Sequence, residues 1–126
     1  RLSLVGSEMC IRDRLKDPVD FIDIENLWKN KYDENDFQGY HIHSQTTWSF
    51  IINYSVEETK TQFFNPYFSD IQNQTPRRIS EDMPIIYMPK LKRGQMILFP
   101  SWVAHQVIAG NKGITISGNV KCRVGS

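Results

Sequence analysis

The sequence has few of the features that mark secreted or nucleic-acid-binding proteins. It holds two cysteines, Cys10 and Cys122, which are too few for a disulfide framework and do not form a close metal-ligand pair. The 15 Lys and Arg residues are balanced by 14 Asp and Glu residues, and no basic run is longer than KLKR. A phosphate-binding surface, and with it a nucleic-acid partner, is therefore not expected.

Long apolar runs are also missing. None approaches the roughly 20 residues that cross a bilayer, and the first residues lack the apolar core of a signal peptide. We therefore expect no membrane partner and a soluble, cytoplasmic protein. The chain further lacks a Gly-x-Ser-x-Gly elbow, a phosphate-cradling glycine loop before a helix, and a cysteine beside a histidine partner. These absences disfavour acyl transfer and nucleotide chemistry.

What is present suffices for one modest domain. The chain has 126 residues, of which 40% are hydrophobic and 12% aromatic, a composition typical of a globular protein with a single core. Its start, RLSLVGSEMCIRDR, resembles a peptide that arises when sequencing-adapter bases are translated. Residues 1–14 are therefore expected to be non-native, and the native chain to be longer.

Residues 15–38 are expected to form a short helix and a loop that pack on the rest of the domain. Asp17 can cap a helix and Pro18 suits its first turn. Apolar residues then recur at helical spacing from Phe21 to Tyr32, and a polar loop ends at Gly39.

From residue 39 to residue 126 the pattern changes to that of strands. Six short runs are rich in β-branched and aromatic residues and are separated by prolines and glycines: TTWSFIINYSV, TQFFNPYF, MPIIYMP, QMILFP, HQVIAG and GITISGNVKC. This pattern predicts an all-β sandwich or barrel. The polar stretch from Ser69 to Met83 is expected to be a surface loop.

The chain has three histidines, and two of them lie in the string HIH. Side chains two residues apart in a strand point to the same face, so His41 and His43 can present their imidazoles side by side to a metal ion. The alternative is that both are polar residues on a solvated strand. His105 favours a metal site, because it follows a glycine turn at Gly94, an apolar strand and Pro100.

This order of glycine, apolar strand, proline and histidine resembles the second metal-binding motif of cupins, and HIH resembles their first. A closer resemblance is to the 2-oxoglutarate- and Fe(II)-dependent oxygenases of bacteria, phages and marine metagenomes. It covers Gly39 to about Lys121, and it is carried by HIH, Tyr54, FFNP at Phe63 to Pro66, RGQMILFPSWVAH at Arg93 to His105, and GITISGN at Gly113 to Asn119.

The resemblance implies a double-stranded β-helix, a jelly-roll or cupin-like barrel, with Fe(II) at its open end. It assigns His41 and His105 as iron ligands and places His43 where the family usually has Asp or Glu. Because Gln45, the next such position, would be a poor ligand, three histidines are the more consistent set.

The resemblance also implies 2-oxoglutarate as co-substrate, whose far carboxylate needs a cation and a hydroxyl. The family's Arg-x-Ser pair corresponds here to Gly113 and Thr115, so the hydroxyl is kept and the arginine is absent. Lys112 and Lys121 are candidates to replace the arginine, and Tyr54 is a further candidate donor.

Three aromatic residues, Trp48, Phe50 and Trp102, could form a substrate pocket, although aromatic residues in strands more often belong to the core. The substrate is expected to be a small molecule or a side chain, and the expected reaction is hydroxylation. Two alternatives stay open. One is a three-histidine cupin-like metalloenzyme that uses no 2-oxoglutarate, and the other is a non-catalytic β-barrel module for binding or assembly.

Overall fold

The computed structural model describes residues 21–66 and 85–123, and every regular element within them is a strand. There are eight, in the order β1 (Phe21–Tyr32), β2 (Gln38–His41), β3 (Trp48–Asn53), β4 (Thr61–Phe64), β5 (Ile86–Tyr87), β6 (Met96–Pro100), β7 (His105–Val107) and β8 (Gly113–Arg123). The predicted all-β class is confirmed. In this described part, no helix is long and apolar enough to cross a membrane.

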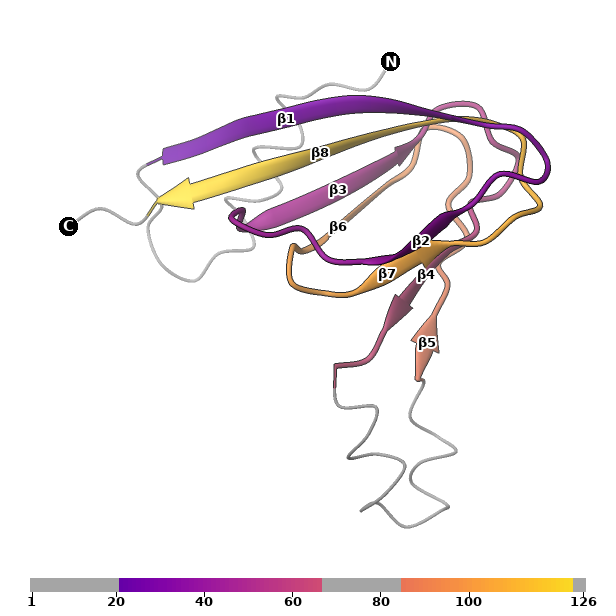
Figure 1. Ribbon diagram of the computed structural model, residues 1–126. Helices are drawn as coiled ribbons and strands as arrows, with labels where there is room; N and C mark the ends of the chain where they lie inside the picture. Colours follow the sequence, from indigo (N-terminus) through magenta and orange to yellow (C-terminus); the bar gives the residue numbers. More distant parts are fainter. Residues whose placement is uncertain (1–20, 67–84, 124–126) are drawn as a thin grey trace, which may run out of the picture.

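The strands form two four-stranded antiparallel sheets. The first sheet has the order β1-β8-β3-β6 and the second the order β2-β7-β4-β5. Figure 1 shows the second sheet lying below the first, with the chain passing from one sheet to the other at most connections. Eight strands that alternate in this way between two sheets are the arrangement of a jelly roll.

The prediction of a helix after Asp17 is wrong for residues 21–32, the part of the predicted helix that the structure describes. Phe21–Tyr32 is the long edge strand β1, paired with β8 along its length, while Asp17 and Pro18 lie outside the described residues. Trp28 and Tyr32 are four residues apart, and a spacing of four fits both about one turn of a helix and two periods of a strand. The pairing with β8 decides for the strand.

The two faces of the first sheet differ in character. On the face turned away from the second sheet, Phe50, Ile52 and Val120 form an apolar cluster that draws only on the first sheet. Between the sheets, Ile51 and Phe99 of the first sheet meet Phe63 of the second.

Strand β8 is polar on the inside and apolar on the outside. Its residues Thr115, Ser117 and Asn119 share the inward face with Ile51, whereas Ile116 and Val120 belong to the outer cluster. The space between the sheets is therefore lined in part by hydroxyl and amide groups.

A β-bulge divides β1 into two halves. The pairing with β8 shifts by one residue between Ile24 and Asn26. Even-numbered residues of β1 therefore point to one face of the sheet before the bulge and to the opposite face after it. Ile22 and Ile24 join the outer apolar cluster. Beyond the bulge, Trp28 lines the space between the sheets.

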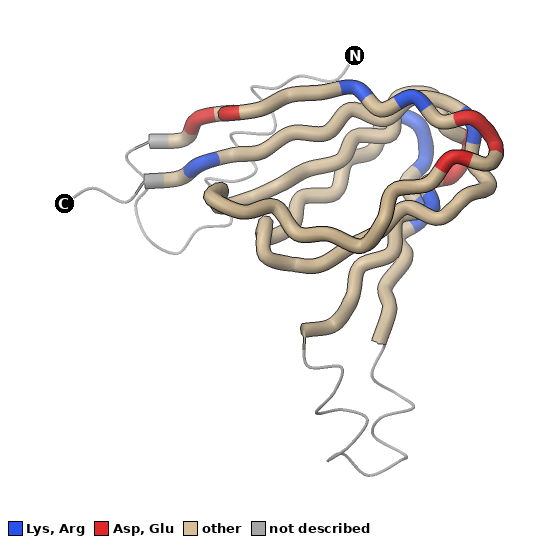
Figure 2. Tube along the Cα trace, in the orientation of Figure 1, with Lys and Arg blue, Asp and Glu red and all other residues tan. Residues whose placement is uncertain are grey.

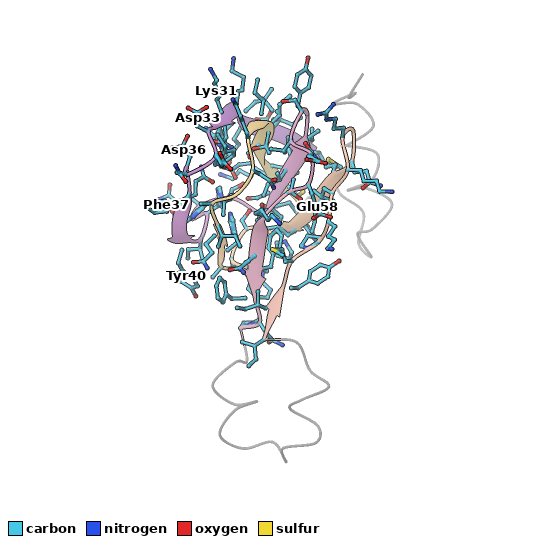
Figure 3. All side chains as sticks on the ribbon, turned by 90° about the vertical axis from the view of Figure 1, so that its right-hand side faces the viewer. Lys31, Asp33, Asp36, Phe37, Tyr40 and Glu58 are labelled. Atoms are coloured by element: carbon cyan, nitrogen blue, oxygen red, sulfur yellow. The ribbon has the colours of Figure 1, made fainter. Side chains whose placement is uncertain are left out.

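The barrel has two unlike ends. At one end, four connections meet: residues 33–37, 54–60, 88–95 and 108–112. Figure 2 shows that most of the charged residues of the described part gather at this end, with both signs mixed. Figure 3 shows Lys31, Asp33 and Asp36 along its edge. The other end carries the connections 42–47 and 101–104 and holds all three histidines.

Candidate metal centre

The two sheets bring the three histidines together from distant parts of the sequence. His41 ends β2 and His105 begins β7, and the two residues are direct partners in the second sheet. His43 lies two residues beyond β2, where its backbone N–H donates to the carbonyl of Ser101 at 3.0 Å. The connection 101–104, which precedes His105, therefore also holds the segment that carries His43 through a backbone hydrogen bond.

The ring nitrogens of these residues have the spacing of ligands that share one ion. One nitrogen from each of His41, His43 and His105 lies within 4.8 Å of the other two, and the Nε2 atoms of His43 and His105 are 3.2 Å apart. Ligands at about 2.1 Å from one ion are about 3 Å apart when they subtend a right angle. In the described part of the chain, no carboxylate joins this group.

The opposite nitrogens of two of these rings are held by backbone carbonyls. Nδ1 of His41 lies 2.7 Å from the carbonyl oxygen of Gly39, and Nδ1 of His105 lies 3.0 Å from that of Val103. Since a carbonyl only accepts, each Nδ1 carries the proton and donates. Nε2 of each ring then keeps its lone pair for an ion, as is usual for histidines that bind metals.

Burial favours the neutral form of two of these imidazoles. It lowers the pKa of His105 to about 4, with a smaller opposite contribution from the Val103 carbonyl and further lowering by His41 and His43. Burial and the neighbouring His41 also lower the pKa of His43, against a hydrogen bond with the Asn119 side chain. Metal binding requires neutral imidazole, so near neutral pH these two rings need lose no proton.

The imidazoles face a pocket between the two sheets. Its wall includes Trp28, Gln38, Ile51, Phe99 and Ser117 in addition to the histidines. A second cavity lies toward the charged end of the barrel and shares Gln38, Ile51 and Ser117 with the first. The two cavities are thus neighbours that share part of their wall.

Hydrogen-bonding groups line the boundary between the two cavities. Asn30 donates through Nδ2 to Ser117 Oγ at 3.1 Å and to Thr115 Oγ1 at 3.4 Å, and it accepts from Gln38 Nε2 at 3.3 Å. The Tyr32 hydroxyl makes a hydrogen bond with Thr115, and burial raises the pKa of Tyr32 despite that bond. Asn30 thus connects Gln38, Thr115 and Ser117, which line the second cavity together with Tyr32.

Two further groups of the second cavity suit an anion. Lys60, just before β4, is the cation among the residues that line it. Asn111 also lines it, and its amide nitrogen is buried without a hydrogen-bond partner. A buried donor without a partner costs about 1–3 kcal/mol, so this position favours a ligand that accepts a hydrogen bond.

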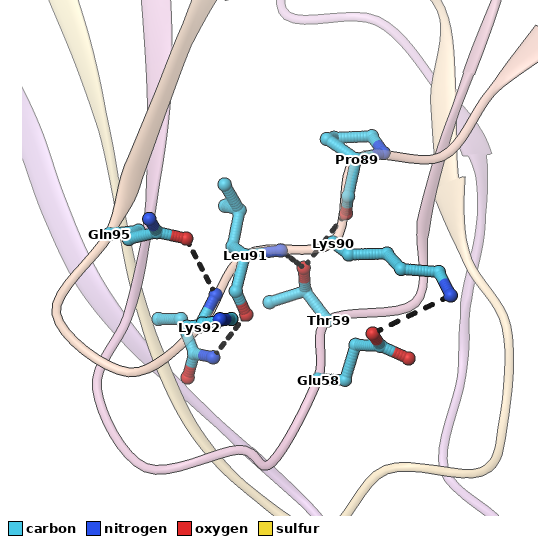
Figure 4. Close-up of polar contacts among 8 residues, drawn as sticks. Glu58, Thr59, Pro89, Lys90, Leu91, Lys92 and Gln95 are labelled. Atoms are coloured by element: carbon cyan, nitrogen blue, oxygen red, sulfur yellow. Dashed lines mark hydrogen bonds and ion pairs between the residues drawn. The ribbon is translucent and has the colours of Figure 1, made fainter.

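Neighbouring contacts fix the position of Lys60. Thr59 Oγ1 donates to the carbonyl of Pro89 and accepts from the backbone N–H of Leu91, both at 3.2 Å (Figure 4). Lys60 itself accepts through its carbonyl from the N–H of Ile108 at 3.1 Å. Hydrogen bonds thus hold the main chain at Thr59 and Lys60 to two of the connections at the charged end, 88–95 and 108–112.

Of the four residues expected to bind 2-oxoglutarate, the structure places only Thr115 in the cavity wall. Tyr54 is 59% exposed. Lys112 is exposed and does not line the cavity. The ammonium of Lys121 lies 3.7 Å from the Glu25 carboxylate, near the other end of β8. The structure therefore does not bring Tyr54, Lys112 and Lys121 to the site.

The three aromatic residues expected in a substrate pocket are dispersed. Trp48 packs against the outer apolar cluster, which contains Phe50. Phe50 borders the histidine pocket through its place in β3, but its ring lies over Gly118 on the outer face. Trp102 is 61% exposed and lines a surface groove with Tyr40 and Ile42.

Sequence reasoning missed Trp28, Asn30, Tyr32 and Lys60. The first three follow a period of two, which would have indicated an inward face had the segment been assigned as a strand. For Lys60 the sequence carries no signal, because its place in the cavity depends on which connections meet at the charged end.

Comparisons with known proteins identify the family of the chain. A search of curated proteins finds no match. Among solved structures, the chain is similar to a cupin domain from Bordetella pertussis Tohama I, with 12% sequence identity, a TM-score of 0.46, and coverage of 87% of this chain and 99% of that chain. The family model described as "Putative 2OG-Fe(II) oxygenase" matches residues 26–119, which is most of the chain and includes all three histidines. The resemblance seen in the sequence is confirmed, and the chain belongs to this family of 2-oxoglutarate–Fe(II) oxygenases.

Proposed function

We propose that this protein is an Fe(II)- and 2-oxoglutarate-dependent dioxygenase that hydroxylates a small molecule or a side chain. The observation that carries the proposal is the convergence of three imidazoles on one point in a pocket between the sheets, next to a second cavity that shares part of its wall. The match to the oxygenase family supports the same reading.

The residues present fit iron. Imidazole is a ligand that suits iron, and His41, His43 and His105 offer three such nitrogens. Three ligands leave further coordination positions for a co-substrate and dioxygen. When bound, Fe(II) and 2-oxoglutarate supply the dioxygen chemistry, and the part of the chain is to hold both and to limit access of water.

Several donor groups of the second cavity suit the far carboxylate of a dicarboxylate co-substrate. These donors are Lys60, the unpartnered amide of Asn111, and the hydroxyls of Tyr32 and Thr115; Asp36 is the carboxylate among the lining residues. A carboxylate accepts from each of these donors, and a bond from a charged donor is about twice as strong as a neutral one. Lys60 thus offers the positive charge that the missing arginine would supply. The other end of the co-substrate would then face the histidines.

The wall around the histidines limits what can approach. Trp28 stacks on His43 with ring centroids 5.8 Å apart and an interplanar angle of 21°, and Phe99 meets His105 edge-to-face. These aromatic faces exclude water from two sides of the metal position. They also favour a substrate that presents a C–H bond on an apolar surface.

A three-histidine metalloenzyme that uses no 2-oxoglutarate is the second candidate. It is favoured by the donor set, because no carboxylate joins the three neutral imidazoles in the described part of the chain. A metal ion there keeps its full double charge, which strengthens binding of an anionic substrate directly to the ion.

Turnover of 2-oxoglutarate by the iron-loaded protein tests the proposal. We expect succinate formation and dioxygen uptake that both require 2-oxoglutarate. Both should be lost in His105→Ala and kept in Lys92→Ala, a variant at an exposed position. Dioxygen uptake that is independent of 2-oxoglutarate would favour the second candidate. Wild-type protein that retains no iron would contradict both and favour a non-catalytic module.

A further inference from the structure

The two connections at the histidine end, 42–47 and 101–104, are joined through the main chain of Ser101. Its carbonyl accepts from the N–H of His43 at 3.0 Å, and its N–H donates to the carbonyl of Thr47 at 3.1 Å. Strand β2 ends at His41, so the position of His43 depends on this bond to Ser101. Ser101 thus holds the segment that carries His43 at two points.

The same connection leads directly to a second candidate ligand, His105. Val103 closes a turn by donating through its N–H to the carbonyl of Pro100 at 3.0 Å. The carbonyl of Val103 lies 3.0 Å from Nδ1 of His105. Because Ser101 lies within this turn, its position affects two of the three candidate ligands.

The side chain of Ser101 is buried and hydrogen-bonded. Its Oγ lies 2.9 Å from Oγ of Ser49 in β3, and both residues are 1% exposed. Ser49 donates its one hydroxyl proton to Asn119 Oδ1 at 2.9 Å, so Ser101 is the donor between the two hydroxyls. The amide nitrogen of Asn119 donates in turn to Asn26 Oδ1 at 3.3 Å. A row of hydrogen bonds therefore runs from Ser101 through β3 and β8 to β1.

This row connects the site to the first sheet. Ser49 and Asn119 belong to that sheet, whereas His41 and His105 belong to the second. Hydrogen bonds are stronger in a buried setting than in water, and a buried hydroxyl has few other partners to choose from. The Ser101 hydroxyl therefore fixes the connection 101–104 against the first sheet.

We propose that Ser101 is a positioning residue for the metal centre: its hydroxyl, bonded to Ser49, fixes the carbonyl that holds the His43 main chain and the turn that leads to His105. The inference rests on the proposed metal site. It gives the serine of the FPSW string a role in metal binding that is exerted through the main chain, without contact between its side chain and a ligand ring.

Co(II) titration of metal-free protein tests the proposal, because the visible spectrum of Co(II) reports both affinity and ligand geometry. Loss of a supporting contact around metal ligands typically weakens metal binding 10–100-fold, and we expect about tenfold for Ser101→Ala, with a changed spectrum. Ser49→Ala removes the same hydrogen bond from its other side. The double variant should therefore bind Co(II) only slightly more weakly than either single variant.

Ser55→Ala is the matched control. It removes a hydroxyl that accepts from the N–H of Ile114 at 2.9 Å, at the opposite end of the barrel. We expect wild-type Co(II) affinity and spectrum in this variant. A loss of affinity in Ser55→Ala as large as that in Ser101→Ala would show general destabilisation and overturn the proposal.

Equal Co(II) affinity and spectrum in Ser101→Ala and wild type would also overturn it. Amide hydrogen exchange of the metal-free wild type needs no variant: the N–H groups of His43 and Ser101 lie outside the regular strands and should nevertheless exchange slowly. Fast exchange at His43 would contradict the proposal. Wild-type protein that binds no Co(II) would overturn the proposed function itself, whereas a wild type that binds Co(II) as tightly as Ser101→Ala overturns only this inference.

Discussion

Metal-free protein should lose stability when the pH falls from 7 to 5, and His105 is the main cause. The side chain is 2% exposed, so solvent screens little of its environment. Its pKa is about 4 in the folded chain, compared with 6.5 for an ordinary histidine. Below pH 6.5 the His105 imidazole binds a proton in the unfolded chain, whereas in the folded chain it binds one only as the pH approaches 4. Acid therefore favours unfolding over this whole interval.

The size of the effect follows from the separation of the two pKa values. Each pKa unit corresponds to 1.36 kcal/mol, so the full difference is about 3 kcal/mol. About 2 kcal/mol of this is lost between pH 7 and pH 5, because at pH 5 the unfolded histidine is almost fully protonated and the folded one is not. The lowered pKa of His43 acts in the same direction and adds to the loss.

Urea unfolding at several pH values in the presence of a chelator measures this free energy. The chain has only three histidines, so their imidazole NMR signals can be followed individually during the same titration. We expect the His105 signal to stay unchanged down to pH 5. A His105 signal that titrates near 6.5, or an unfolding free energy that is equal at pH 7 and pH 5, would refute the burial argument.

Three more changes test other parts of the molecule. Lys60→Met should weaken 2-oxoglutarate binding to the metal-loaded protein by about tenfold or more, since a charge-assisted hydrogen bond contributes about 1.5–3 kcal/mol. Calorimetry measures this affinity, and the control variant Lys112→Met should show no such loss. Equal losses of affinity in the two variants would argue against a role for Lys60. Gly118→Ala should lower the free energy of unfolding by about 1–3 kcal/mol, because the added Cβ overlaps the Phe50 ring. Gly39→Ala, whose Cβ meets no atom within 4 Å, is the control, and similar denaturation midpoints for the two variants would contradict the packing. A divalent metal at 100 times its dissociation constant should raise the unfolding free energy of wild type by about 2.7 kcal/mol, and the same gain in His105→Ala would exclude His105 as a ligand.

The approach of the histidines to one another could be anticipated from the sequence only in part. The HIH spacing indicated a shared face on one strand, but β2 ends at His41, and His43 is placed by its backbone bond to the distant Ser101. The order of glycine, apolar run and proline did mark the approach to His105. The all-β class likewise followed from short strands separated by prolines and glycines. Each of these inferences needs only residues close together in the chain.

The errors arose where the answer depends on distant pairing. Lys121 does share a strand face with Thr115, but six residues at about 3.3 Å each place it some 20 Å away, beyond the cavity. For β1, a spacing of four residues satisfied two periods at once, and only the partner strand β8 distinguishes them. Lys60 reaches the second cavity through contacts with residues that are 30 to 50 positions away in the chain.

The inverted pattern of β8 also separates the requirements of folding from those of chemistry. Its outward residues Ile116 and Val120 belong to the apolar cluster that holds the first sheet together, while its inward residues Thr115, Ser117 and Asn119 face the site. Substitutions on one face therefore leave the other face in place. Such a strand allows its inward side chains, which face the site, to change without disturbing the apolar cluster on its outer face.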